Sequence, residues 1–477
     1  MISVLLVSAS VMALASVARA DVEISNKPTS NMSCVSGVCT ATAAKAVLNI
    51  GDLQTMLASG DVAVKTGSVA KDIDVDQPLQ WTSTARLTLD AQQAVQIEKQ
   101  VTVAGQGALT VTTNDSGTKA KNKTGAFVIV PEHGSVQFWD LNSSLIIEGA
   151  TYTLIGDIKT LASDIAANPS GFYALAKPYD ASQDGVYSNS PVTTPFQGAF
   201  EGLGNQIASL TISSTVQSAV VGFFGGIDFP GVVRNFRIAK AHVYASGANG
   251  VGLLVGAGNF GQIVRCHVTG QIAFTGTVSV GGLVNENEGS IADSSADVRI
   301  LGSAARSVGG LAAFNDATVT SSYTWGSLAL RNSNLAYAGG LVGENHGIVE
   351  NSFARNRVNN GRKNNNSYFG GVTGENDSDG QIRYSYAAGE ISPYSGGLVG
   401  FDAAAAGNIS KSYWDLDMGV SDPSRGAGNI KNDPGITGLT TRQLQSGLPK
   451  GFNSKIWGSN PKINNGYPYL LANPPLK

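Results

Sequence analysis

The sequence repeats itself between Gly222 and Trp414. The clearest copies are VGGLVNENEGSIADSSA, VGGLAAFNDATVTSSYT, AGGLVGENHGIVENSFA, FGGVTGENDSDGQIRYSYA and SGGLVGFDAAAAGNISKSYW, and two weaker copies precede them. The second glycines of successive copies are 26 to 31 residues apart: Gly226, Gly252, Gly282, Gly310, Gly340, Gly371 and Gly397. A period of this length is typical of solenoids, propellers and repeat arrays.

The content of each copy favours a solenoid. The copies contain short apolar or alternating runs and lack the 3.6-residue stripe of an amphipathic helix. They are also shorter than the roughly 40 residues of a propeller blade. We therefore predict an all-β fold, a right-handed parallel β-helix in which each copy forms one coil of three short strands. Short helices are expected in the lead-in to the repeats and in the C-terminal cap.

Alignment of the copies places identical residues in columns. Stacked asparagine amides can bond to one another along the solenoid axis, so one column is predicted to be a structural ladder. That column contains Asn287, Asn315, Asn345 and Asn376 and ends at Asp402. A second column of small residues is predicted to be buried: Cys266, Ser294, Ser322, Ser352, Ser385 and Ser412. The residue after the serine is aromatic in the later copies.

The phrase Gly-Gly-Leu-Val-Gly-Glu-Asn followed by Ser-Phe-Ala or Ser-Tyr-Ala resembles the GLUG motif of bacterial secreted and surface proteins. The resemblance covers roughly residues 222–414. GLUG repeats occur in large exported proteins related to filamentous haemagglutinin, and Ala-Arg-Leu-Thr-Leu-Asp-Ala near residue 88 looks like a passenger repeat of that type. The resemblance implies a surface protein and carries no catalytic residues.

The rest of the chain divides into further segments. Residues 1–20 match a secretory signal peptide, with an apolar run followed by an Ala-x-Ala site before Asp21. We expect a polar segment with a cysteine pair at 21–47, haemagglutinin-like strands at 48–150 and a lead-in with a short helix at 151–212. The GLUG solenoid should then span 213–415. The cap, 416–477, should cover the strand edges of the last coil.

The sequence contains three cysteines. In an exported protein Cys34 and Cys39 are expected to form a small disulfide loop. Cys266 lies in the small-residue column, so we predict a buried structural thiol. Its neighbour His267 should point to the opposite face of the strand.

Carboxylates recur once per coil at Glu286, Glu344 and Glu375. Such a row could bind Ca²⁺ or act as acid and base. We interpret it as the solvated side of a turn, because Phe314 and Phe401 interrupt it.

The segment beginning at Glu375 resembles the start of a calcium loop, through Asp377, Asp379 and Gly380. However, Tyr386 stands where the bidentate glutamate of such a loop is needed. We predict no metal and no cofactor, with Ca²⁺ as the alternative.

Net charge is −3 and only 14% of residues are charged, which argues against a nucleic-acid partner. We predict a secreted or cell-surface, non-enzymatic protein of adhesin type, whose glycan or protein ligand the sequence does not name. Any translocation partner or attachment must be a separate protein, or the chain is a piece of a larger system. The alternative is a β-helical polysaccharide lyase or hydrolase, which needs a non-repeating carboxylate cluster.

The least repetitive loops, 115–125 and 355–366, are the candidate ligand contacts. The basic residues of the second loop are Arg355, Arg357, Arg362 and Lys363.

Overall fold

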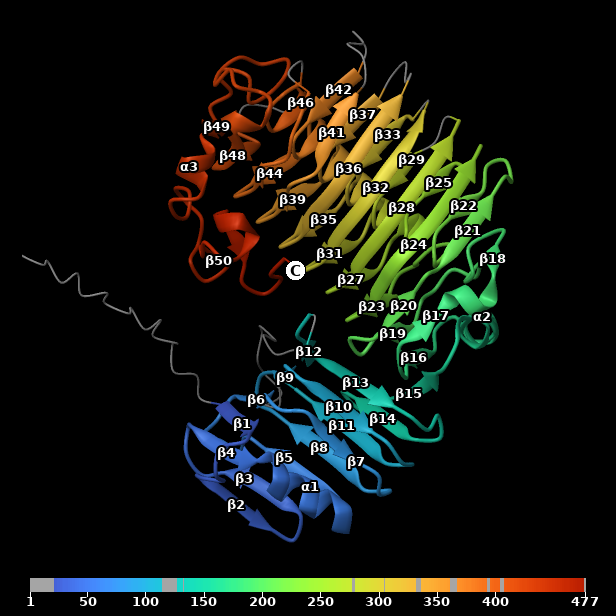
Figure 1. Cartoon of the computed structure of the whole chain (residues 1–477), viewed down its shortest axis with the longest axis vertical. Helices are drawn as coiled ribbons and strands as arrows, with labels where there is room; N and C mark the ends of the chain where they lie inside the picture. Colours follow the sequence, from blue (N-terminus) through green and yellow to red (C-terminus); the bar gives the residue numbers. More distant parts are fainter. Residues whose placement is uncertain are drawn as a thin grey trace, which may run out of the picture.

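The computed structural model describes residues 21–113, 127–131, 133–276, 279–303, 305–331, 336–360, 367–392, 395–403 and 407–475. This part of the chain is a parallel β-solenoid with three short α-helices (Figure 1). The predicted all-β parallel solenoid, with helices in the lead-in and the C-terminal segment, is confirmed. The apolar core falls into two large clusters, which divide the solenoid into a first and a second body.

The first body, blue to cyan in Figure 1, has three sheets. Along their strands, apolar side chains that point into the core alternate with side chains that point outward. One sheet consists of β12 (Phe127–Ile129), β9 (Val95–Ile97), β6 (Asp72–Val75), β1 (Asp21–Ser25) and β4 (Ala46–Asn49). Another consists of β13 (Ser135–Phe138), β10 (Gln100–Val103) and β7 (Leu79–Trp81). The third begins with β2 (Met32–Val35), β3 (Val38–Ala41), β5 (Val62–Lys65), β8 (Arg86–Asp90), β11 (Ala108–Thr112) and β14 (Ser144–Ile147).

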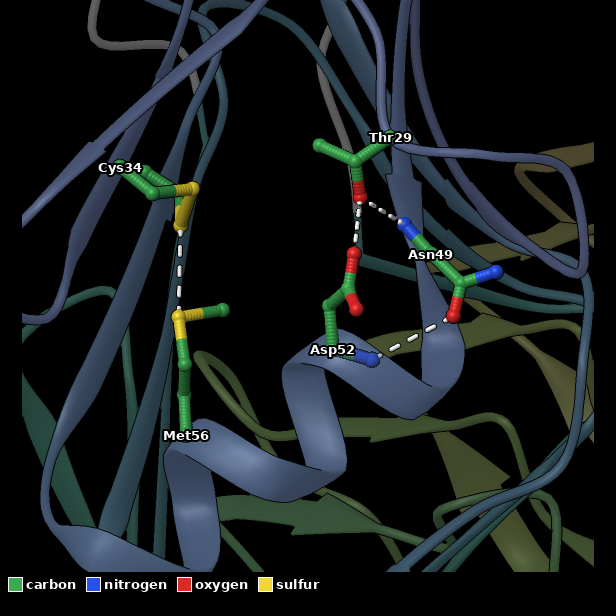
Figure 2. The surroundings of a disulfide bond; sticks show 6 residues. Thr29, Cys34, Asn49, Asp52 and Met56 are labelled. Atoms are coloured by element: carbon green, nitrogen blue, oxygen red, sulfur yellow. Dashed lines mark hydrogen bonds between the residues drawn. A yellow bond between two sulfur atoms is a disulfide. The ribbon is translucent and has the colours of Figure 1, made fainter.

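Helix α1 (Ile50–Ser59) packs against the edge of the first body. Asn49 caps it, since the Asn49 side chain accepts from the backbone N–H groups of residues 51 and 52. Thr29 Oγ1 donates to Asp52 Oδ2 at 2.6 Å and accepts from the Asn49 N–H (Figure 2). A disulfide joins Cys34 and Cys39 across the β2–β3 hairpin, next to Met56 of α1.

Residues 21–47 are therefore an integral part of the first body and do not form a separate polar segment. Strand β1 lies between β4 and β6, with Ile24 opposite Leu48 on one side and Val75 on the other. Val22 and Ile24 are fully buried. The alternation in Asp-Val-Glu-Ile-Ser predicts such a strand, but the polar residues that follow it dominate the composition of the segment.

The outer face of β1, β6 and β9 places carboxylates on neighbouring strands. Burial, followed by the charges of Asp21, Asp76, Glu98 and Asp72, raises the pKa of Asp74 to about 7. Since the folded chain holds this proton more tightly than the unfolded chain, the contribution of Asp74 to stability is greatest below about pH 4. This contribution is lost as the pH rises from about 4 through about 7.

We therefore expect Asp74→Asn to stabilise the first body by about 1–3 kcal/mol at pH 8 and to change little at pH 4. Urea unfolding across this pH range measures the effect. Asp379→Asn, at an exposed position, is the control. An equal effect of Asp74→Asn at both pH values would contradict the burial argument.

The second body, green to orange in Figure 1, has four sheets, so each repeat forms a coil of four strands and not the three expected. Sheet 1 continues from β14 through β15 (Ala150–Ile155), β16 (Phe172–Leu175), β19 (Ala199–Glu201), β23 (Val232–Arg234), β27 (Gln262–Val264), β31 (Ser290–Ala292), β35 (Thr318–Thr320), β39 (Ile348–Glu350), β44 (Gln381–Arg383) and β47 (Ile409–Ser410). Sheet 2 contains β17 (Tyr179–Asp180), β20 (Gln206–Ala208), β24 (Arg237–Ser246), β28 (His267–Thr275), β32 (Ser295–Ser303), β36 (Tyr323–Arg331), β40 (Phe353–Ala354), β45 (Tyr386–Ala387), β48 (Ser412–Asp415) and β49 (Ile436–Leu439), with β18 (Val186–Tyr187), β21 (Thr211–Ser214) and β41 (Arg357–Asn360) at its side.

Two further sheets of six strands complete the coil. Sheet 3 contains β22 (Val220–Val221), β25 (Gly250–Val251), β29 (Ser279–Gly281), β33 (Ser307–Gly309), β37 (Ala336–Gly339) and β42 (Ser367–Gly370). Sheet 4 contains β26 (Val255–Asn259), β30 (Val284–Asn287), β34 (Ala312–Asn315), β38 (Val342–Asn345), β43 (Thr373–Asn376) and β46 (Val399–Asp402).

The paired glycines explain the fourth strand. They separate sheet 3 from sheet 4 by a bend so tight that a Cβ on Gly339 would lie 1.8 Å from the Val342 carbonyl oxygen. Only glycine permits this approach. Sequence patterning treats Gly-Gly-Leu-Val as one corner, whereas the chain forms a strand on each side of it.

The two bodies are joined by an antiparallel pair, β14 and β15, within one continuous sheet. Helix α2 (Ile158–Ala167) follows β15, is capped by Asp157 and buries Ile158, Leu161 and Ile165, as the lead-in pattern predicts. A 3₁₀ turn, η1 (Ala181–Asp184), comes next. Across the junction, the Phe127 carbonyl accepts from Arg265 Nη2 at 3.2 Å.

The C-terminal segment lies along the flank of the second body as well as beyond its last coil. The segment begins with η2 (Leu416–Met418), and strand β49 then extends sheet 2. It continues through α3 (Thr441–Leu444), β50 (Trp457–Gly458), η3 (Asn464–Gly466) and β51 (Tyr469–Leu470). It reaches back so far that Asn473 Nδ2 donates to the Ser294 and Ser321 carbonyls. The segment thus covers more of the second body than the strand edges of the last coil. In the described residues, no helix has the length and apolar character needed to span a membrane.

Candidate functional site

The asparagine column lies inside the solenoid and forms a continuous chain of hydrogen bonds. Each Nδ2 donates to the Oδ1 of the next coil at 2.8 Å, from Asn287 through Asn315 and Asn345 to Asn376. Asn376 then donates to Asp402 Oδ1 at 3.0 Å. These four asparagines are fully buried, so the ladder satisfies polar groups that would otherwise be unpaired in the core.

The ladder is longer than the alignment indicates. Asn259 Nδ2 donates to Asn287 Oδ1 at 2.9 Å and adds a rung before the predicted start. At the other end the Asn429 side chain pairs with the backbone N–H and carbonyl of Asp402, in the manner of a further strand. In the weak copy VGAGNFGQ, Asn259 stands seven residues before Cys266, as Asn287 stands seven residues before Ser294, and this spacing could have found it.

The small-residue column is also a hydrogen-bonded ladder. Its members are at most 1% exposed. From Cys266 to Ser385, each backbone N–H donates to the serine Oγ of the next coil, for example Ser322 N–H to Ser352 Oγ at 3.2 Å. The preceding residues have φ between 47° and 53° and turn the chain from sheet 1 into sheet 2: Arg265, Asp293, Ser321, Asn351, Tyr384 and Lys411. A residue at this bend therefore needs to be small and to accept a hydrogen bond.

Cys266 is fully enclosed in this column, and burial raises the pKa of its thiol to about 12. Such a thiol is a structural group and a poor nucleophile. His267 is also buried, at 4% exposure, because the first body packs over it, and burial lowers its pKa to about 3. Its Nδ1 lies 2.8 Å from Ser295 Oγ.

The basic residues of the candidate contact loop have different surroundings. Arg355 is predicted to contact a ligand, but it is not available for one. Its guanidinium lies between the rings of Trp325 and Tyr467 and donates to Asn464. It attaches the C-terminal segment to the solenoid. Arg357 is exposed and forms an ion pair with Glu390 at 3.1 Å. Arg362, Lys363 and the loop 115–125 lie outside the described residues.

Sheets 3 and 4 approach each other along the outside of the solenoid, where side chains of adjacent coils meet. A Cβ on Gly343 would lie 2.2 Å from Ser307 Oγ of the previous coil, and one on Gly374 would meet the backbone of β37. These glycines therefore permit the approach. The next residues, Glu344 and Glu375, face side chains of sheet 3.

We call this region the outer seam and define it by Glu286, Arg306, Phe314, Tyr337, Glu344, Tyr368, Glu375 and Phe401. The Tyr337 and Tyr368 rings stack with centroids 5.7 Å apart, and Phe401 lies 4.9 Å beyond Tyr368. The Arg306 guanidinium lies 5.1 Å from the centroid of the Phe314 ring. The phenylalanines that interrupt the carboxylate row in sequence are thus part of the same surface.

Glu344 is buried and Glu286 and Glu375 are partly buried, so this row of carboxylates is less solvated than predicted. Burial raises the pKa of Glu286 and Glu375, and it raises the pKa of Glu344 to about 7. Glu344 is only 7% exposed. Among the described residues, none forms a hydrogen bond with Glu344 Oε1.

The segment that resembles a calcium loop is a tight turn, in which the Gly380 N–H donates to the Asp377 carbonyl at 2.9 Å. Asp377 Oδ2 lies 3.6 Å from His346 Nε2. Within the described ranges, no group of three or more histidine, cysteine, aspartate and glutamate side chains is arranged to hold a metal ion.

Comparison with known proteins finds partial matches. The chain is 30% identical over 150 residues to halomucin of Haloquadratum walsbyi, a stretch that covers 31% of this chain and 2% of halomucin. It is 30% identical over 203 residues to the immunoglobulin A1 protease of Streptococcus pneumoniae, covering 42% of this chain and 9% of that protein. No protein-family model matches.

A crystal structure described as a candidate immunoglobulin A1 protease from Bacteroides ovatus superposes with a TM-score of 0.41 at 17% identity, covering 68% of this chain and 92% of that one. The chain spans only small parts of the two curated relatives, 2% and 9% of their lengths. Together, the periodic sequence and the stacked coils identify the chain as a repeat protein built on a parallel β-solenoid.

Proposed function

We propose that the chain is an exported, non-enzymatic protein of the adhesin type, which presents the outer face of its solenoid to a cell surface, a glycan or a protein. The observation that carries this proposal is the use of the repeated residues. The asparagine and serine columns are occupied with internal hydrogen bonds, whereas the outer seam extends over several coils. Solenoids characteristically bind through such extended faces.

Several features support export. The signal pattern at residues 1–20 precedes Asp21 directly, although these residues lie outside the described part of the chain. The Cys34–Cys39 disulfide is typical of oxidising compartments. The resemblance to GLUG repeats and to haemagglutinin-type proteins also implies a secreted or cell-surface location.

A second candidate function is cleavage of a polysaccharide, as a hydrolase or lyase. It is favoured by the pairing of Glu344 with Glu375 on adjacent strands, which lie about 4.8 Å apart in a parallel sheet. Residues opposite each other in such a pair project to the same face of the sheet, and retaining glycosidases use two carboxyl groups about 5–5.5 Å apart. The raised pKa of Glu344 would suit a general acid.

We expect the chain to adhere to cells or to immobilised glycans without turnover. Adhesion and depolymerisation assays on the same preparation of residues 21–477 test this. Glu344→Gln and Glu375→Gln are the informative variants, and Glu390→Gln, at a half-exposed ion pair, is the control. Depolymerisation that either seam variant abolishes would establish the enzymatic candidate in place of the adhesin.

A further inference from the structure

We propose that the outer seam is a binding site for an uncharged glycan chain. This assignment rests on the proposed adhesin function and specifies its ligand class. It follows from three properties of the seam: polar atoms without partners, aromatic rings in a row, and the balance of charge.

Two buried polar groups of the seam region lack partners in the described structure. Glu344 Oε1 and Asn285 Oδ1 accept no hydrogen bond, although the two residues are 7% and 9% exposed. Asn285 precedes Glu286 on β30 and packs on Gly250 of sheet 3, where a Cβ would lie 2.4 Å from Asn285 Nδ2. Buried acceptors nearly always receive a hydrogen bond in folded proteins. A ligand that donates hydrogen bonds would therefore satisfy Glu344 Oε1 and Asn285 Oδ1.

The aromatic rings supply an apolar surface beside Glu344 and Glu375. Tyr337, Tyr368 and Phe401 follow one another across adjacent coils, and all three are half-buried. Tyr337 also contacts Glu375 of the neighbouring sheet, so the tyrosines of sheet 3 lie beside the glutamates of sheet 4. A sugar chain presents both C–H faces and hydroxyl groups along its length, which matches these two parallel rows. Apolar walls with a few placed polar groups are the common form of ligand sites.

The charge balance indicates an uncharged ligand. Three carboxyl groups line the seam; Arg306 acts on Glu286 and Glu344, and His346 acts on Glu344 and Glu375. An acidic polysaccharide would meet net repulsion. A cationic peptide would require ionised carboxylates, whereas burial favours the protonated form of Glu344. A protonated carboxyl both donates and accepts hydrogen bonds, as a sugar hydroxyl does.

The test is binding of the purified chain to an array of neutral oligosaccharides, namely glucans, mannans, galactans and N-acetylglucosamine oligomers. Polygalacturonate serves as the acidic probe and oligolysine as the cationic probe. We expect at least one neutral oligosaccharide to bind, and Tyr337→Ala/Tyr368→Ala to weaken it about tenfold or more. Tyr244→Ala, at an exposed tyrosine on sheet 2, is the matched control and should bind normally. Thermal melting confirms that the variants fold.

The pH dependence gives a readout that loss of folding would not mimic. The groups facing Glu344 are Ser307 and Arg306 from the sheet 3 side, with Glu375 and His346 from its own and adjacent coils. Because burial favours the protonated carboxyl, glycan affinity should fall about threefold to tenfold as the pH rises through 7. Glu344→Gln, which also donates and accepts, should bind with little dependence on pH. A cationic ligand would show the opposite trend.

The proposal fails if no neutral oligosaccharide binds, if only oligolysine or polygalacturonate binds, or if Tyr337→Ala/Tyr368→Ala leaves glycan binding unchanged. Cell adhesion measured in parallel distinguishes a failure of the seam as the glycan site from a failure of the adhesin function. Adhesion that survives the double tyrosine substitution would retain the adhesin function and overturn the seam as its site. Glycan binding at the seam without adhesion to cells would support the site and overturn the adhesin function.

Discussion

Replacing Asn345 by leucine should destabilise the middle of the second body by about 2–4 kcal/mol. Asn345 is at the centre of the ladder, where its Oδ1 accepts from Asn315 and its Nδ2 donates to Asn376, both at 2.8 Å. Leucine has a similar size but neither donates nor accepts. The substitution therefore leaves polar atoms on both neighbouring coils without their partners inside the core, and each such loss costs about 1–3 kcal/mol.

The measurement should resolve local stability, because long repeat arrays do not unfold in a single step. Native-state hydrogen exchange of the β34 and β43 amides reports the coils on either side of the change. Asn359→Leu, at an exposed asparagine on β41, is the control and should leave these amides unchanged. Equal protection in both variants would show that the ladder contributes nothing to stability.

The sequence predicts the ladders because stacking imposes the same requirement on every coil. An asparagine that bonds to its own copy must recur once per period, so Asn287, Asn315, Asn345 and Asn376 appear as a column before any coordinates are known. The same logic places the serine column and the coil period. It does not reveal that the serine Oγ accepts from the backbone of the preceding coil, because a buried small residue also explains the pattern.

Features that depend on contacts between distant segments were not predicted. Arg355 appears in the sequence as an exposed basic residue of an irregular loop, yet it contacts Tyr467 and Asn464, more than a hundred residues away. Glu344 appears as part of a solvated row, and its burial comes from the bend between sheets 3 and 4. Likewise, His267 is covered by the first body, which no local pattern indicates.

The C-terminal segment shows the same dependence and leads to the largest expected effect. The aromatic residues that follow the serine column stack on one another outside the core, with Tyr323, Phe353 and Tyr386 in succession at 5.0 and 5.1 Å between centroids. The C-terminal segment covers this stack, with Trp457 at 5.8 Å from Tyr386 and at 4.6 Å from Phe452. An aromatic stack of this length would otherwise form a continuous exposed apolar patch.

Trp457→Ala should therefore destabilise the second body by about 3–5 kcal/mol. The indole is 1% exposed and its Nε1 donates to Asn351 Oδ1 at 3.2 Å, so the substitution creates a cavity and removes a hydrogen bond.

Ending the chain after Leu439 should have a larger effect than Trp457→Ala. It uncovers the stack, so we expect binding of a hydrophobic dye and self-association in light scattering. Trp139→Ala, at a tryptophan that is 55% exposed, should change neither property. If Trp457→Ala melts at the same temperature as Trp139→Ala and the shortened chain does not self-associate, the C-terminal segment does not stabilise the second body. The aromatic column would then be stable in contact with water.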